Sequence, residues 1–308
     1  MAAPQAKASD ILRKNAAEGK QSFSFEFFPP KTDAGMDKLL GSMADFQKQG
    51  PVFIDFTWGA GGTTSEQTPA LCKKCKEMGF IVNMHLTCTN MPQGKVKEAL
   101  DMCKENGITN IVALRGDPPA GQEWKASEDG FNCALDLVKY IKANYGDYFS
   151  IAVAGYPEGH PDRIDAASGK CADFDAEMAY LKEKIVAGGE YIITQLFYDT
   201  DIFLKFVQTC RANGIDVPIL PGMLPFTAYG GLQRMATLCK TYIPADLQAK
   251  VEELKEKPDD FKQLGIDVTA EQCKKILASG ACSHLHFYTL NQSYSTFKVM
   301  EQLGWLKQ

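Results

Sequence analysis

Eight short apolar segments recur along this chain of 308 residues, most of them separated by stretches with helical periodicity. This alternation constrains the fold more than any other feature. The segments are rich in β-branched and aromatic residues, and they are apolar enough to be covered on both faces, as parallel strands are. We therefore predict parallel strands at 22–28, 52–58, 81–88, 110–116, 150–156, 191–199, 218–224 and 283–290.

The stretches between these segments are typical of helices. Apolar residues recur at helical spacing in residues 93–105 and in residues 174–187. Gly188-Gly189 ends the second of these helices, and Asn106-Gly107 and Asn213-Gly214 are further helix stops that precede a strand. Strand, helix, glycine stop and strand is the rhythm of a parallel α/β sheet.

Eight such units favour a closed (β/α)8 TIM barrel over a doubly wound sheet. A doubly wound dinucleotide-binding fold normally carries a glycine-rich fingerprint after its first strand, whereas the first segment here ends in Pro29-Pro30. Between the seventh and eighth strands we predict extra helices near 244–256 and 269–279, joined by a turn at Pro258–Asp260. With no linker, internal repeat or low-complexity tract, residues 1–308 are expected to form a single catalytic barrel domain.

Composition excludes several classes of function. The formal net charge of -5 is spread along the chain, and no Lys/Arg cluster could follow a nucleic-acid backbone. The N-terminal stretch has no apolar signal-peptide core, and no run of about 18 apolar residues predicts a transmembrane helix. The 10 cysteines are scattered and are expected to be thiols, so we interpret the protein as cytoplasmic, with no membrane partner.

Polar residues stand where the predicted strands end, which in parallel barrels is where active sites form. Such groups are costly when they are unpaired in a dry core, so their recurrence at seven strand ends predicts one shared polar cleft. They are Glu26; Asp55 and Thr57; His85 and Thr87; Arg115 and Asp117; Tyr156, Glu158 and His160; Gln195 and Asp199; and Tyr288 and Asn291.

Glu26 is the sharpest single candidate. It stands among Phe25, Phe27 and Phe28. A carboxyl in a desolvated apolar pocket can stay protonated near neutral pH and act as a general acid. The alternative is a structural glutamate that pairs with a neighbouring arginine or lysine.

The segment Arg115-Gly116-Asp117 is a second candidate. An arginine offers a fork of donors to anionic or carbonyl groups, and Gly116 allows a ligand to approach the backbone. The alternative is a surface turn that Pro118-Pro119 stabilises.

Three other patterns favour structural roles. Cys72-Lys-Lys-Cys75 lies in a predicted helix and has no second cysteine pair, which disfavours a metal or redox role. His284-x-His286 has no evident third ligand, so the two histidines are expected to be structural or to line a ligand site. Gly59–Gly62 lacks the spacing of a phosphate-binding fingerprint and is interpreted as a strand-end turn. No metal site is predicted.

Taken together, the strand ends resemble those of the methylenetetrahydrofolate reductase family. The matching segments occur in family order on the predicted strands and cover most of the chain, from about residue 22 to residue 303. They are FSFEFFPPKT (23–32), DFTWGAGG (55–62), HLTC (85–88), ALRGDPP (113–119), AGYPEGHPD (154–162), ITQLFYD (193–199), PGMLPF (221–226) and HFYTLN (286–291).

The resemblance implies a flavoenzyme. Members of this family hold FAD non-covalently in a (β/α)8 barrel without a Rossmann fingerprint. They reduce 5,10-methylenetetrahydrofolate to 5-methyltetrahydrofolate, which supplies methyl groups for methionine synthesis. The scheme is ping-pong: NADH or NADPH passes a hydride to the flavin and leaves, and the folate then accepts the hydride. Relatives commonly associate, so a homo-oligomer is expected.

Roles also carry over from the family motifs. Glu26 would be the general acid that protonates the bridging nitrogen of the folate and opens its five-membered ring to an iminium. Asp117 would lie near the flavin and the pterin, tune the flavin potential and stabilise developing positive charge. Gln195 would hydrogen-bond the pterin, and Tyr288 would complete the flavin and folate wall.

The remaining implied contacts are with FAD. Lys184 would meet the FAD phosphates, and Glu177 a ribose. The positions expected to line the rest of the cofactor are Thr57, His85, Leu114, Arg115, Gly116, Asp117, Tyr156 and His160.

The chain departs from the family pattern in two places. Gln292 stands where the family often has an arginine, which leaves the group that holds the folate's glutamate tail unassigned. Larger eukaryotic relatives carry a C-terminal regulatory domain that binds S-adenosylmethionine, whereas this chain ends at residue 308. We expect no such domain and no inhibition by micromolar S-adenosylmethionine.

Two other classes of function stay open. A flavin-free barrel lyase or aldolase could use Glu26 and Lys184, and a colourless protein that is unaffected by FAD would favour it. A catalytically idle folate- or nucleotide-binding barrel would show no folate turnover, with or without a Glu26→Gln change. The choice between NADH and NADPH is not encoded in any Rossmann selector residue.

Overall fold

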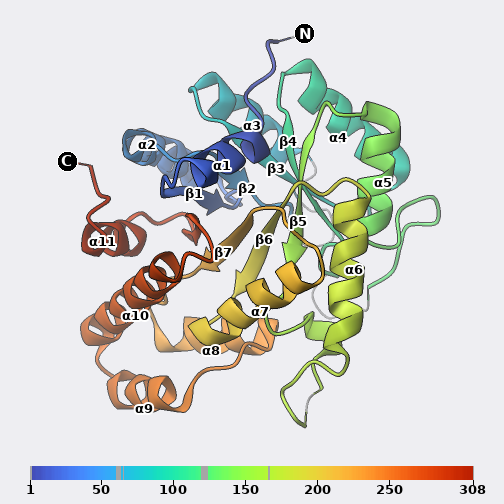
Figure 1. Ribbon diagram of the computed structural model, residues 1–308. Helices are drawn as coiled ribbons and strands as arrows, with labels where there is room; N and C mark the ends of the chain where they lie inside the picture. Colours follow the sequence, from blue (N-terminus) through green and yellow to red (C-terminus); the bar gives the residue numbers. More distant parts are fainter. Residues whose placement is uncertain (1, 60–63, 65, 119–123, 166, 308) are drawn as a thin grey trace.

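Eight parallel strands close into a barrel in chain order, each hydrogen-bonded to the next and β8 to β1 (Figure 1). The computed structural model describes residues 2–59, 64, 66–118, 124–165 and 167–307. The predicted (β/α)8 TIM barrel and its strand segments are therefore confirmed. The strands are β1 Ser22–Phe27, β2 Ile54–Phe56, β3 Val82–Thr87, β4 Asn110–Leu114, β5 Ser150–Gly155, β6 Tyr191–Leu196, β7 Ile219–Met223 and β8 His284–Tyr288.

Alternation along the strands separates two layers of core. Outward side chains of β1 such as Phe25 and Phe27 pack against Phe46 of the following helix, with ring centroids 5.0 and 4.8 Å apart. Inward side chains such as Val112 and Leu220 form a separate cluster inside the barrel. The larger core therefore lies between barrel and helices, and the inner face of each strand is free to carry the site.

Helices surround the barrel (Figure 1). The predicted helix at 93–105 is confirmed without change, and the one at 174–187 ends at Val186, before Gly188 with φ +130°. Nowhere in the described ranges is a helix long and apolar enough to cross a membrane. The helices between strands are α2 Asp33–Gln49, α3 Gln67–Glu77, α4 Gln93–Glu105, α5 Ala134–Tyr145, α6 Phe174–Val186 and α7 Thr200–Ala212, and α11 Tyr294–Gln302 follows β8.

The connection between β7 and β8 holds three helices: α8 Tyr229–Cys239, α9 Ala245–Leu254 and α10 Pro258–Ser279. Helix α9 confirms the helix predicted near 244–256, and the one predicted at 269–279 is the second half of α10. The predicted turn at Pro258–Asp260 is wrong, because these residues form the first turn of α10. A proline needs no hydrogen-bond donor there, and two aspartates favour a helix N-terminus.

Helix α1, Ala8–Ala17, lies across the N-terminal end of the barrel. Its Ala8 N–H donates to Oδ1 of Asn110 at the start of β4 over 2.7 Å, and Leu12 joins the cluster inside the barrel. The helix thus covers the N-terminal end of the barrel, which we call the lower end. Ligands are expected at the opposite end, where the strands finish.

Candidate functional site

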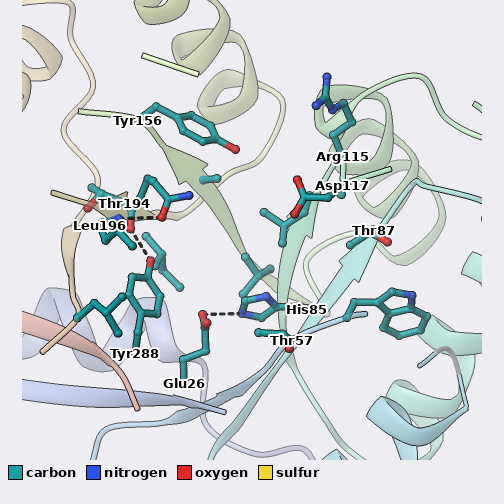
Figure 2. Close-up of a pocket in the computed structure, with 18 of the residues that line it drawn as sticks. Glu26, Thr57, His85, Thr87, Arg115, Asp117, Tyr156, Thr194, Leu196 and Tyr288 are labelled. Atoms are coloured by element: carbon teal, nitrogen blue, oxygen red, sulfur yellow. Dashed lines mark hydrogen bonds and ion pairs between the residues drawn. The ribbon is translucent and has the colours of Figure 1, made fainter. Parts of the chain in front are cut away.

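Two cavities meet at the C-terminal ends of the strands. The axial cavity, of about 310 Å³, lies over the barrel axis and is lined by Glu26, Thr57, His85, Gln195 and Tyr288 among others (Figure 2). The lateral cavity, of about 290 Å³, lies beside α5 and α6 and is lined by Cys133, Glu177, Tyr180 and Lys184 among others. The walls that they share are Leu114, Arg115, Ala154, Tyr156 and His160.

The structure brings together every residue to which a catalytic, cofactor-binding or substrate-binding role was assigned from the sequence. Of these, Glu177 and Lys184 line the lateral cavity, and the others line the axial cavity, four of them both. Their individual roles remain predictions. The axial residues are Glu26, Thr57, His85, Leu114, Arg115, Gly116, Asp117, Tyr156, His160, Gln195 and Tyr288. Among the other polar strand-end residues, Thr87 lines the axial cavity, whereas Asp55, Glu158, Asp199 and Asn291 line neither cavity.

Glu26 points into the barrel, not among phenylalanines. Because alternate residues of a strand face opposite ways, Phe25 and Phe27 pack outside the barrel, so the expected phenylalanine pocket around this carboxyl is wrong. Glu26 Oε2 instead lies 3.5 Å from Nε2 of both His85 and His286, and its side chain is 17% exposed. Its partners are histidines, not the arginine or lysine of a structural pair.

Asp55 is the fully buried member of this group. Its Oδ2 lies 3.2 Å from Nε2 of His85 and 3.8 Å from Nε2 of His286. Burial raises the pKa of Asp55, against the opposing effect of the hydrogen bond with His85. Burial acts to lower the pKa of His85, but the hydrogen bond with Asp55 and the charge of Glu26 outweigh it, and the pKa is raised. Asp55 and His85 are therefore coupled through their hydrogen bond and can share a proton.

His286 completes the group from β8 and is fully buried. Its Nε2 makes no hydrogen bond within the described residues, although it faces the two carboxyls, whereas its Nδ1 lies 2.7 Å from the hydroxyl of Ser24. Ligand atoms of Glu26, Asp55 and His286 lie within 4.8 Å of one another, close enough for a metal ion to bridge. The absence of a metal site stays a prediction.

Tyr288 and Gln195 form the opposite wall of the axial cavity. The Tyr288 hydroxyl donates to the carbonyl oxygen of Thr194 over 2.5 Å, and burial raises the pKa of Tyr288 well above its ordinary value, so it stays a phenol. Gln195 Oε1 accepts a hydrogen bond from the Leu196 N–H, so the NH2 group of the Gln195 amide points away from that N–H. In Figure 2 Tyr288 lies beside Glu26, across the cavity from Asp117.

Arg115 and Gly116 form a wall between the cavities. The Arg115 guanidinium contacts Asp162 Oδ2 at 2.7 Å, while its buried Nε makes no hydrogen bond to a described residue. Gly116 has φ +84°, and a Cβ there would lie 2.7 Å from Cβ of Thr87. Glycine is thus required to pack this segment on β3. Of the proposed surface turn, Pro119 lies outside the described residues, as do residues 60–62 of the predicted Gly59–Gly62 turn.

His160 follows β5 and packs edge-on against Tyr156, with ring centroids 4.7 Å apart. Its Nδ1 accepts from the N–H of Asp162. Burial, together with the charge of Arg115, lowers the pKa of His160 to about 4. The ring is therefore neutral near pH 7 and serves as a polar wall, not as a cation.

The lateral cavity carries charge from α6. Lys184 is buried, and its Nζ donates to the carbonyl oxygen of Ala154 over 2.7 Å and lies 5.1 Å from the centre of the Tyr180 ring. Burial lowers the pKa of Lys184 to about 8. Glu177, also buried, pairs with Arg163 Nε at 3.0 Å. A buried ammonium facing a cavity is well suited to an anionic ligand.

Sequence reasoning gave no role to several residues of this site. Asp162 and Arg163 lie in the short 3₁₀ helix Pro161–Arg163, beyond the strand end. His286 was interpreted as structural or ligand-lining, without a link to Glu26. The available signal was the period of two in Ser22-x-Ser24-x-Glu26 and His284-x-His286-x-Tyr288, which places each set on one strand face.

Cys72 and Cys75 lie in α3, as predicted, and are free and buried in the layer between helix and sheet. Burial raises the pKa of Cys75 to about 12, and that of Cys72 well above its ordinary value. Such thiols are poor nucleophiles and poor metal ligands, which agrees with a structural role.

A family model described as methylenetetrahydrofolate reductase matches residues 11–304. A rice protein named probable methylenetetrahydrofolate reductase (NADH) is 48% identical over 305 residues, which cover 98% of this chain and 51% of that protein. A Caenorhabditis elegans protein named probable methylenetetrahydrofolate reductase (NADPH) is 34% identical over 296 residues, 93% of this chain and 43% of that one. The chain thus spans about half the length of these relatives.

A solved structure shares the fold at 13% identity, with a TM-score of 0.60 over 94% of this chain and 97% of the other. It is described as an uncharacterized protein from Clostridium thermocellum that binds two copies of 5-methyl-5,6,7,8-tetrahydrofolic acid. At this identity the likeness supports the barrel fold alone.

Proposed function

The chain belongs to the methylenetetrahydrofolate reductase family, and from this premise we propose that it reduces 5,10-methylenetetrahydrofolate to 5-methyltetrahydrofolate with NADH or NADPH. The proposal includes non-covalent FAD, a ping-pong order of substrates and a supply of methyl groups for methionine synthesis. One observation carries it: the carboxyl of Glu26 lies at the floor of the axial cavity, between two histidines.

Glu26 would protonate the bridging nitrogen of the folate, which opens the five-membered ring to an iminium. An iminium accepts a hydride far more readily than the closed ring does. A carboxyl can give up its proton there because His85 and His286 lie 3.5 Å from its Oε2 and stabilise the carboxylate that remains. The proton is thus held at a defined atom, inside the barrel and largely away from solvent.

Three further residues would orient the folate. Gln195 presents its amide to the axial cavity and would hydrogen-bond the pterin, while Tyr288 forms the wall beside Glu26. Asp117, on the far side of the same cavity, would stabilise positive charge that develops on the substrate. These assignments follow from the family motifs and agree with the facing positions of the side chains.

The residues present fit FAD. A dinucleotide is long and carries two phosphates, and the two cavities share a wall and offer Lys184 and Arg115 to anionic groups. The unpartnered Nε of Arg115 and the buried ammonium of Lys184 are both donors that a phosphate or a flavin carbonyl could satisfy. When bound, FAD would supply a ring that takes a hydride from NAD(P)H and gives it up to the folate.

The barrel lyase is less well supported by the geometry. Glu26 lines the axial cavity and Lys184 the lateral one, and the Lys184 ammonium is held by the carbonyl of Ala154. A lyase that uses both residues on one small substrate needs them in one cavity.

The test measures the two half-reactions separately by stopped flow in the Glu26→Gln variant. We expect flavin reduction by NAD(P)H to be unchanged and the folate half-reaction to slow by about 10²- to 10⁴-fold, the usual contribution of a general acid. Glu253→Gln, an exposed glutamate of α9, is the matched control and should change neither. Equal loss in both halves refutes the role of Glu26, and a protein that stays colourless with FAD refutes the proposed function.

A further inference from the structure

Serine and histidine side chains fill one seam of the barrel interior, between β1 and β8. Ser22 is paired with His284 in the register of the two strands, and Ser24 with His286. All four are buried, Ser24 and His286 completely. Barrel interiors are usually filled by bulky branched residues, so an unbroken polar seam is an unusual choice that has to be explained. We call these four residues the β1–β8 seam.

The seam is hydrogen-bonded from end to end. Ser22 Oγ lies 2.8 Å from His284 Nδ1, and His284 Nε2 lies 2.8 Å from Ser24 Oγ. Ser24 Oγ also lies 2.7 Å from His286 Nδ1. The last atom of the series, Nε2 of His286, lies 3.5 Å from Glu26 Oε2 and 3.8 Å from Asp55 Oδ2, and it has no hydrogen-bond partner among the described residues. The series therefore leads to the proposed acid.

Each bond in the seam can point the same way. A neutral imidazole has one N–H donor and one acceptor nitrogen, and a hydroxyl can donate and accept at once. Burial, together with the neighbouring His286, lowers the pKa of His284 well below its ordinary value, so this ring is neutral. With both histidines protonated at Nε2, every group donates to the next in the direction of Glu26.

The other end of the seam lies at the lower end of the barrel, beside α1. A cavity of about 480 Å³ is lined there by His284, by Gln21 and Ser283 next to it, and by the exposed Arg13. Ser22 is 7% exposed and follows Gln21 directly. The seam thus joins Glu26 to solvent on the side of the barrel opposite the axial cavity.

The proposed reaction creates a need for such a path. Each turnover consumes one proton, which Glu26 delivers to the folate, so the carboxylate must be reprotonated before the next turnover. During each half-reaction the cofactor and either folate or NAD(P)H would fill the axial cavity and restrict that route from solvent. On the basis of the proposed function, we propose that the β1–β8 seam is a proton relay that recharges Glu26 from the lower end of the barrel.

The transfer balances without any redox change. Glu26 Oε2 takes the proton on His286 Nε2, and His286 Nδ1 takes the hydroxyl proton of Ser24. Ser24 Oγ takes the proton on His284 Nε2, His284 Nδ1 takes that of Ser22, and Ser22 takes one from solvent. One O–H bond forms at Glu26, and one proton leaves the solvent. Both rings end as the other neutral tautomer. The seam is reset when the hydroxyls rotate and each ring exchanges protons with water, releasing the one on Nδ1 for each one taken at Nε2.

A second histidine contacts Glu26 but offers a shorter path. His85 is hydrogen-bonded to Asp55, which is completely buried, and Asp55 Oδ1 has no hydrogen-bond partner within the described residues. That branch reaches only the axial cavity, which His85 lines, and no described contact of it leads to the lower end of the barrel. The β1–β8 seam, in contrast, reaches the cavity at the lower end of the barrel, which His284 lines.

The test is the Ser24→Ala variant, which removes the central hydroxyl. Enzyme that has been reduced and equilibrated in buffer should complete its first folate reduction at the wild-type rate, because equilibration gives the proton time to reach Glu26 by any route. Steady-state turnover should fall by about tenfold or more, because reprotonation now limits the rate. Ser150→Ala is the matched control: Ser150 is also buried in a barrel strand but lies outside the seam, and its removal should leave both rates unchanged.

A conservative replacement and a chemical rescue distinguish a proton relay from a merely structural role of the seam residues. Ser24→Thr keeps a hydroxyl and should restore turnover. Imidazole added to His284→Ala should raise its steady-state rate, since the lower cavity gives access to the vacated position. In the intact protein, ¹⁵N spectra should show the His284 imidazole as neutral.

Equal first-turnover and steady-state losses in Ser24→Ala, or a wild-type steady-state rate, would overturn the relay alone. If the unaltered protein reduces no methylenetetrahydrofolate with NADH or NADPH, the proposed function falls and takes the relay with it.

Discussion

The axial and lateral cavities share a wall, yet they are built in opposite ways. At the axial cavity, Glu26 and His85 line the wall and contact the fully buried Asp55 and His286, and the four residues come from four strands. In the lateral cavity the charged groups come from α6 and from the loops after β4 and β5, and Arg163 and Asp162 are exposed. A shared-proton network needs the rigid, dry interior, whereas an anion site needs donors at the rim that an entering ligand can reach.

We therefore expect that substitutions in the lateral cavity change FAD affinity without changing the folate half-reaction, and that substitutions at the axial cavity do the reverse. The largest effect is expected for Lys184→Met, which removes the buried ammonium of the lateral cavity. The dissociation constant of FAD should rise by about 100-fold, since a hydrogen bond to a charged group contributes about 1.5–3 kcal/mol. Titration of the apoprotein followed by flavin fluorescence measures it.

Lys182→Met, on the exposed side of the same helix, is the control and should leave FAD affinity unchanged. At saturating FAD the folate half-reaction of Lys184→Met should match the wild type. A loss of the folate step at saturating cofactor would show that the two cavities are not separable.

The pH dependence of FAD binding is a second test of the role of Lys184 in the lateral cavity. Burial lowers the pKa of Lys184 to about 8, and an anion beside it favours the charged form. Affinity should therefore be complete below pH 8 and weaken above it, by up to about tenfold per pH unit. Lys184→Met should abolish this dependence between pH 7.5 and about pH 9.5, and persistence of the slope in that variant would assign it to another group.

A smaller effect is expected from Asp55→Asn, a buried residue behind Glu26 and His85 of the axial cavity. Loss of the Asp55 carboxylate removes a hydrogen bond and a charge that raise the pKa of His85, so its NMR titration midpoint should move to lower pH. The folate half-reaction should slow by roughly fivefold, which corresponds to about 1 kcal/mol for one hydrogen bond. FAD affinity should stay the same; a rise in its dissociation constant would contradict the separation of the cavities. A thermal melt checks that the variant is folded.

The smallest effect is expected from Arg163→Gln at the rim of the lateral cavity. Arg163 pairs with Glu177 at 3.0 Å but is 42% exposed, and exposed ion pairs typically contribute about 0–1 kcal/mol. The dissociation constant of FAD should change by less than about fivefold. A change as large as that of Lys184→Met would mean that this arginine binds the cofactor directly.

Much of the barrel could be predicted from the sequence because apolar strands and glycine helix stops are local signals. Helix α4 was predicted residue for residue, whereas the start of α10 was not, because Pro258 favours a turn and a helix N-terminus alike. Helix α1 was not predicted either. Its role depends on the contact of Ala8 with Asn110, far away in sequence.

The polar residues of the axial cavity could be predicted from the rule that active sites lie at strand ends. The α6 residues of the lateral cavity could not be predicted in this way. Glu177 and Lys184 lie on a helix, so no strand-end argument reaches them, and they were named through the family resemblance. The surroundings of Glu26 were misjudged for a different reason. Neighbours in the sequence were taken as neighbours in space, although in a strand they face opposite sides.

The seam between β1 and β8 also bears on how the chain reaches its folded state. Ser24 and His286, which share a hydrogen bond, are 262 residues apart. During synthesis at about 5–20 residues per second, Glu26 therefore leaves the ribosome well before either β8 histidine exists. Contacts of such long sequence separation form late, because the loop entropy must be overcome first. The barrel cannot close before β8 has been synthesised. Until β8 docks, β1 and β7 are open edges to which another chain could pair.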